Sequence, residues 1–271
     1  MRNRVAACAL SVWLVALPGS AQTPAPAADA GLVPPPAWAF NDLACAPALL
    51  TDRTGADEQP LRVIGVQDSA FRELLAPPDV LVVSGGSAAG LEPGQRYYVR
   101  RIIRTMGTPQ PPTIHTSGWV QIVGVDTTVA TAQILHACEG ILLDDYLEPF
   151  TAPTIAARPL PGNVPHYENM GHIVTGIEGT HTAGVGNVMT IDRGTNAGIA
   201  QGQRFLVFRD KRDLQYDTTG ASTILAEMSR KSPLVEIGEV LVVLTRPNDA
   251  TVQITVAKDA IRVGDLIAPI R

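Results

Sequence analysis

The sequence predicts a mainly β protein built from two tandem small antiparallel β-barrel or sandwich domains that arose by internal duplication. The segment GLEPGQRYYVRR at 90–101 returns as GIAQGQRFLVFR at 198–209, 108 residues later. Residues 130–150 match residues 250–270 at a spacing of 120, so the second copy contains 12 extra residues. Short segments rich in Val and Ile, separated by Gly, Pro, Asp or Thr, fill both copies, as in β domains. A repeat of this length indicates two similar domains and not a solenoid.

The first 60 residues precede the duplicated part. Residues 1–21 have two arginines, an apolar run and a small-residue end, so we expect a signal peptide and export, with the periplasm favoured and an extracellular location open. The apolar run is too short to cross a membrane, and we predict no transmembrane segment. Residues 22–60 are expected to be a Pro/Ala-rich tether followed by a segment that docks on the first domain.

The first β domain is predicted over 61–150 and the second over 167–271, with a stiff Pro-rich linker at 151–166. One or two helical turns are expected near 68–77, and the insertion at 211–233 is either a hairpin or a short helix. Two glycines precede the strand in each repeat, where a loop needs positive φ. A phosphate-binding loop is not favoured, because no helix start and no Gly-Lys-Ser/Thr follows. The repeat-turn residues are Gly90, Gly94 and Asp145 in the first copy and Gly198, Gly202 and Asp265 in the second.

Two cysteines remain once the expected signal peptide is removed, Cys45 and Cys138. An even pair in an exported protein favours a disulfide. Two buried thiols or an intermolecular bridge are the alternatives that the sequence leaves open. His136 lies two residues before Cys138, a spacing that matches no zinc pattern, so we expect a packing role for it.

Composition limits the classes of partner. The chain has 21 Lys and Arg against 26 Asp and Glu, a formal charge of −5, which argues against nucleic acid or an anionic membrane as the main partner. Only 5% of residues are aromatic, few for a carbohydrate-binding surface. Tyr98, Trp119 and Tyr146 have no aromatic counterpart in the second copy, and we predict that these three form an interaction surface.

Candidate catalytic groups are incomplete. His166, His172 and His181 follow the linker closely, but their spacings match no metal motif, and no metal or other cofactor is predicted. Asp144, Asp145 and Glu148 offer paired carboxylates for acid and base work. The second copy keeps only Asp265 at the place of Asp145, so we interpret both as turn acids that bind backbone amides.

Three stretches carry a resemblance: GNVMTIDRGTNAGIAQGQRFLVFR, EIGEVLVVLTRPNDATVQI and AIRVGDLIAPI, all within 186–270. Here the chain resembles a C-terminal β module of exported bacterial envelope proteins, similar to the end domain of flagellar assembly protein T and to regions that follow LysM repeats. The first copy is more loosely similar, with Asp144-Asp145 where Gly-Asp is expected. The resemblance implies a non-catalytic role with an envelope protein or polymer as partner. The alternative is a metal-dependent or hydrolytic periplasmic enzyme with a site between the domains near His166 and His172.

Overall fold

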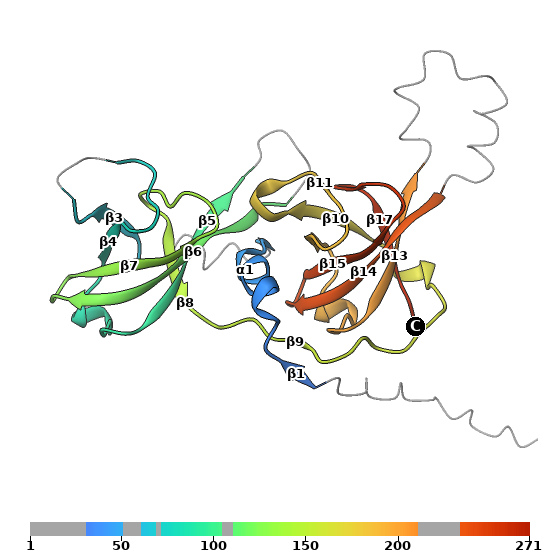
Figure 1. The fold of residues 1–271 in the computed structure, drawn as a ribbon, viewed down its shortest axis with the longest axis horizontal. Coiled ribbons are helices and arrows are strands. Elements are labelled where there is room, and N and C mark those ends of the chain that lie inside the picture. The colour runs from blue at the N-terminus through green and yellow to red at the C-terminus, as the bar shows by residue number, and fades with distance from the viewer. Residues whose placement is uncertain (1–30, 51–60, 69–71, 105–110, 211–233) are drawn as a thin grey trace, which may run out of the picture.

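Two curled β sheets flank one short helix, α1 (Ala37–Cys45), in the computed structural model of the chain (Figure 1). The structure describes residues 31–50, 61–68, 72–104, 111–210 and 234–271. The expected signal peptide and the 211–233 insertion therefore lie outside the described residues. Within the described part, no helix combines the length and the apolar character that a membrane crossing requires. The mainly β fold class with small barrel-like domains is confirmed.

The first module is a curled sheet with the strand order β3-β4-β7-β6-β5-β8, and β2 (Ala48–Leu49) adds to β6. An isolated bridge between Arg62 and Tyr146 brings its two outer strands together. Val99 faces the core and is fully buried, because alternate side chains of a strand lie on one face of the sheet. The strands are β3 (Val63–Val66), β4 (Val80–Ser84), β5 (Arg96–Ile103), β6 (Thr113–Val125), β7 (Val129–Ala137) and β8 (Tyr146–Pro149).

The second module is a closed barrel with the order β10-β12-β15-β14-β13-β17, the same path through equivalent strands. Phe205 and Val207 on β13 point into its core and are fully buried. Beside the barrel, β11 (Thr182–Ala183) pairs with β16 (Ile261–Arg262). The barrel strands are β10 (Gly171–Gly176), β12 (Val188–Ile191), β13 (Arg204–Asp210), β14 (Leu234–Thr245), β15 (Ala250–Ala257) and β17 (Leu266–Pro269).

The repeat turns have the same shape in both modules. A single 3-10 turn, η1 (Ser87–Ala89) or η4 (Thr195–Ala197), ends on a left-handed glycine, Gly90 with φ 79° or Gly198 with φ 74°. An L-side chain at either position would be strained, which explains why glycine stands in both copies.

Helix α1 packs on the first module, where this segment is expected to dock, and it packs on the second module as well. Pro36 precedes the first helical residue, and α1 buries Ala39, Leu43, Ala44 and Cys45. The carbonyl of Pro47 accepts hydrogen bonds from Thr190 Oγ1 at 2.8 Å and Arg246 Nη2 at 2.9 Å, both in the second module. Ala39, Leu43 and Ala46 pack with Val188 and Val243 of the second module, and Ala44 and Cys45 with Tyr98 and Trp119 of the first.

The Pro-rich linker is not a bare connector. Its strand β9 (Ile155–Ala156) pairs with β1 (Leu32–Val33) of the tether. Further along, the Leu160 amide donates to the Gly202 carbonyl at 2.7 Å, and the Val164 amide donates to the Arg271 carbonyl at 3.1 Å. Backbone pairing therefore holds the linker on the second module, which proline content alone does not indicate.

The helical turns expected near 68–77 are not found in the part of this segment that the structure describes, residues 72–77, while 69–71 lie outside it. Leu75 instead forms a bridge with Ile141, its amide donating to the Ile141 carbonyl at 2.9 Å. The Leu75 side chain is fully buried. Core burial of this one leucine therefore overrides the local helical pattern.

Candidate functional site at the junction of the modules

A disulfide clamps helix α1 to the first module. Cys45 ends α1 and Cys138 directly follows β7, with the two Cα atoms 5.7 Å apart and a sequence separation of 93 residues. The predicted intrachain pairing is therefore present, and the alternatives of two thiols or an intermolecular bridge do not apply to this structure. Because α1 also packs on the second module, the clamp sits at the junction of both.

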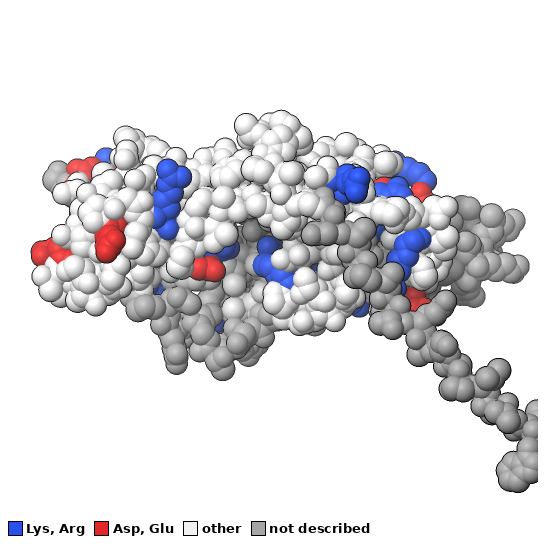
Figure 2. Space-filling model, turned by 90° about the horizontal axis from the view of Figure 1, so that it is seen from below, with Lys and Arg blue, Asp and Glu red and all other residues white. Residues whose placement is uncertain are grey.

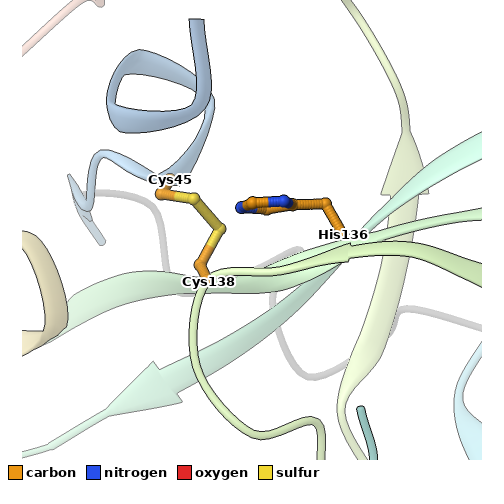
Figure 3. A group of neighbouring side chains, drawn as sticks. All are labelled: Cys45, His136 and Cys138. Carbon is orange, nitrogen blue, oxygen red and sulfur yellow. A yellow bond between two sulfur atoms is a disulfide. The ribbon is translucent and has the colours of Figure 1, made fainter. Parts of the chain in front are cut away.

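His136 lies beside the disulfide, as Figure 3 shows. Residues 136 and 138 are two apart at the end of β7, and strand alternation places their side chains on one side. One ring nitrogen of His136 and the two sulfurs lie within 4.8 Å of one another. The imidazole stacks on Trp119 with the ring centroids 4.3 Å apart and an interplanar angle of 20°. Burial lowers the pKa of His136 below its ordinary value.

The three aromatic residues predicted to form an interaction surface are buried. Tyr98, Trp119 and Tyr146 expose 5%, 7% and 6% of their surface, so the expectation of an exposed patch is wrong. Trp119 packs edge-on against Phe40 of α1. The Tyr98 hydroxyl donates to the carbonyl of Thr151 in the linker at 2.9 Å. Segments distant in sequence thus cover two of these aromatics, which comparison of the two repeats does not reveal.

A cleft of about 360 Å³ opens between the modules, and we call it the intermodule cleft. His115 and Glu139 of the first module and Glu178 and His181 of the second contribute its titratable lining. His115 Nδ1 lies 3.9 Å from a Glu139 carboxylate oxygen. Burial raises the pKa of Glu139, but the nearby His115 imidazole and Arg101 guanidinium outweigh burial, so the pKa of Glu139 lies below its ordinary value.

Each module contains one Arg–Asp pair at an equivalent position, partly buried in the first module and buried in the second. Arg101 Nε donates to Asp145 at 2.7 Å, and Arg209 Nε donates to Asp265 at 2.9 Å. Each aspartate also accepts a backbone amide, from Leu142 at 3.0 Å and from Arg262 at 2.6 Å, which fits the turn-acid interpretation.

Sequence reasoning missed the arginine partners of these aspartates, although both stand at the last position of the repeated 12-residue segment. Pockets of about 330 and 360 Å³ border the two pairs. Asp144 has φ 70° where the second module has Gly264 with φ 95°. The departure from Gly-Asp in the first copy therefore keeps the left-handed turn, and Asp tolerates that conformation better than most residues.

The structure separates the three histidines that follow the linker. His166 donates its backbone amide to Pro269, His172 hydrogen-bonds Asp192 through its amide at 2.8 Å, and His181 lines the intermodule cleft. In the ranges the structure describes, the cluster with three close candidate metal ligands is instead Cys45, His136 and Cys138. Among the described residues, the structure therefore brings no set of metal ligands together around His166 and His172.

A scan against protein-family models finds no match for the chain, and no curated protein matches it.

Proposed function

We propose that the protein is a non-enzymatic, exported protein of the cell envelope that holds two related β modules in one fixed arrangement to bind or assemble an envelope protein or polymer. The observation that carries the proposal is helix α1, which packs into both modules and is bonded covalently to the first. A binding unit of this kind gains from rigidity, because pre-organised surfaces lose less entropy on binding.

Contacts on both sides of α1 oppose relative movement of the modules. Leu43 is buried against the second module, and the Pro47 carbonyl just beyond it accepts two hydrogen bonds from that module. On the opposite side, the disulfide to Cys138 prevents α1 from leaving the first module. Rotating one module would therefore expose apolar surface and leave a buried carbonyl unpaired, both of which cost free energy.

The polar residues that recur in both modules support a non-catalytic role. The side chains of the Arg–Asp pairs form hydrogen bonds within each module, where they join a strand end to a turn. On the face seen in Figure 2, Lys and Arg are scattered among Asp and Glu and do not gather into one basic patch. Such a face offers little to nucleic acid, which needs clustered positive charge.

Export and duplication are parts of the same proposal. A disulfide persists in an oxidising compartment, which supports export directed by the expected signal peptide at 1–21. The identical strand order of the modules, together with repeated turn glycines, supports an origin by duplication.

Capture of partners from an envelope extract, with the purified folded chain as bait, tests the proposal. Wild type should retain one defined partner, and Leu43→Ala should retain less because the helix loses its packing on the second module. Asp42→Ala is the matched control, because Asp42 is an exposed residue of the same helix and its loss should change nothing. Equal capture by wild type and Leu43→Ala would contradict the role of the fixed arrangement.

The enzymatic alternative is tested on the same preparations. The intermodule cleft brings His115 and His181 together with two glutamates, so it is the place where such a site would lie. A hydrolytic activity of the wild type that is lost in His115→Ala and His181→Ala, with partner capture unaffected, would favour the enzyme instead.

A further inference from the structure

The cluster of Cys45, Cys138 and His136 contains one residue, His136, that takes no part in the disulfide. A disulfide requires two cysteines, yet a ring nitrogen of His136 lies within 4.8 Å of both sulfurs. Thiolate and imidazole are the ligands that zinc prefers in proteins. While the sulfurs are bonded to each other they carry no thiolate charge, so the oxidised cluster does not hold a metal ion.

We propose that reduction of the Cys45–Cys138 disulfide turns this cluster into a binding site for one thiophilic divalent cation such as zinc, with the two thiolates and the His136 imidazole as ligands. The inference goes beyond the proposed function. It makes the same three residues either a covalent clamp or a metal clamp, according to the redox state.

The required rearrangement is small. Two thiolates on one tetrahedral zinc ion, each about 2.3 Å from the metal, lie about 3.8 Å from each other. The Cα atoms of Cys45 and Cys138 are 5.7 Å apart. Once the disulfide is broken, rotation of the two side chains can bring the sulfurs to a separation of about 3.8 Å without moving α1 away from the first module.

His136 is already oriented toward the sulfurs (Figure 3). Its ring stacks on Trp119, and Trp119 is held in turn by Phe40 of α1. Packing therefore limits the rotation of the imidazole, and a ligand that is held in position loses less entropy on binding metal. Three protein ligands leave the fourth tetrahedral position to water or another small ligand.

The chemistry balances in two steps. A dithiol reductant transfers two electrons and two protons to the disulfide, which gives two cysteine thiols while the reductant closes to its own disulfide. The divalent cation then replaces the two thiol protons, which pass to solvent. Oxidation reverses the sequence and expels the cation, so the metal-bound and disulfide states exclude each other.

The test uses the full chain with Cys8→Ser, so that two cysteines remain, reduced anaerobically on an immobilised dithiol that is then filtered off. Titration with Co²⁺ should give one equivalent bound, with the visible absorption of a tetrahedral site and a thiolate-to-metal charge-transfer band, and Zn²⁺ should abolish both. The oxidised chain should give neither signal. Absence of a tetrahedral thiolate spectrum in the reduced chain would overturn the proposal.

His136→Ala in the same background should weaken cobalt affinity by more than about tenfold, because a direct ligand contributes at least as much as the supporting partners of metal ligands do. His172→Ala is the matched control and should bind as the parent does, because His172 pairs with Asp192. Equal affinity of His136→Ala and the parent would show that His136 is not a ligand.

A melting experiment covers the case in which reduction weakens the fold. Zinc should raise the melting midpoint of the reduced parent and leave that of the oxidised chain unchanged, since only the former binds it. A zinc effect of the same size in both redox states would refute the redox dependence.

Discussion

Breaking the buried pair of Arg209 and Asp265 should destabilise the protein strongly. The Asp265 carboxylate accepts hydrogen bonds from Arg209 Nε at 2.9 Å and Nη2 at 2.8 Å and from the Arg262 amide at 2.6 Å. The two side chains are only 7% and 5% exposed. In Asp265→Ala the guanidinium stays buried, with Asp259 and the Ala260 carbonyl as its remaining partners. The expected loss in the free energy of unfolding is about 3–5 kcal/mol.

Urea denaturation of wild type and variants measures this loss. Glu236→Gln is the matched control: its pair with Lys258 spans 2.5 Å but lies in solvent, so it should cost less than about 1 kcal/mol. Replacing both partners, as Arg209→Met with Asp265→Leu, should be close to neutral, because no uncompensated charge is then buried. A loss for Asp265→Ala within about 1 kcal/mol of the control would refute the reasoning.

Three further outcomes are expected. Reducing the disulfide in the presence of a metal chelator should lower the free energy of unfolding by up to about 4–5 kcal/mol in urea denaturation, because a long loop is released, and an unchanged midpoint would contradict this. Gly194→Ala should cost about 1–3 kcal/mol in thermal denaturation, because its Cβ would lie 2.2 Å from the Arg246 carbonyl oxygen, whereas Gly184→Ala, with nothing within 4 Å, should be nearly neutral. Burial raises the pKa of Tyr146 from 10.0 to about 12, so its contribution to stability is complete below pH 10 and is lost as pH rises toward 12. Tyr146→Phe should flatten that decline in pH-dependent melting, and an unaltered slope would argue against it.

Local patterns in the sequence were sufficient to predict the main strands of the two modules. Side chains alternate along a strand whatever it pairs with, so Phe205 and Val207 identify a buried face without knowledge of the partner strand. Positive φ at Gly90 and Gly198 is equally local, because it depends on the turn alone. The disulfide was predictable from the even number of cysteines that remain after the expected signal peptide and from the oxidising compartment that export would imply.

Only the tertiary structure decided which surfaces meet. The place of α1 between the modules depends on apolar surface from segments more than 100 residues apart, such as Leu43 and Val243, and no local period records such a contact. Tyr98 and Trp119 have no aromatic counterpart in the second copy, which suggested an exposed interaction surface. They are instead buried under α1 and the linker, through contacts that are equally long-range. The nearness of His136 to both sulfurs follows partly from strand alternation, but its completion by Cys45 required the helix to dock. The sequence by itself determined the main strands of the two modules and their repeat turns, because these depend on short-range patterns. The packing of the modules around one helix determined the candidate site.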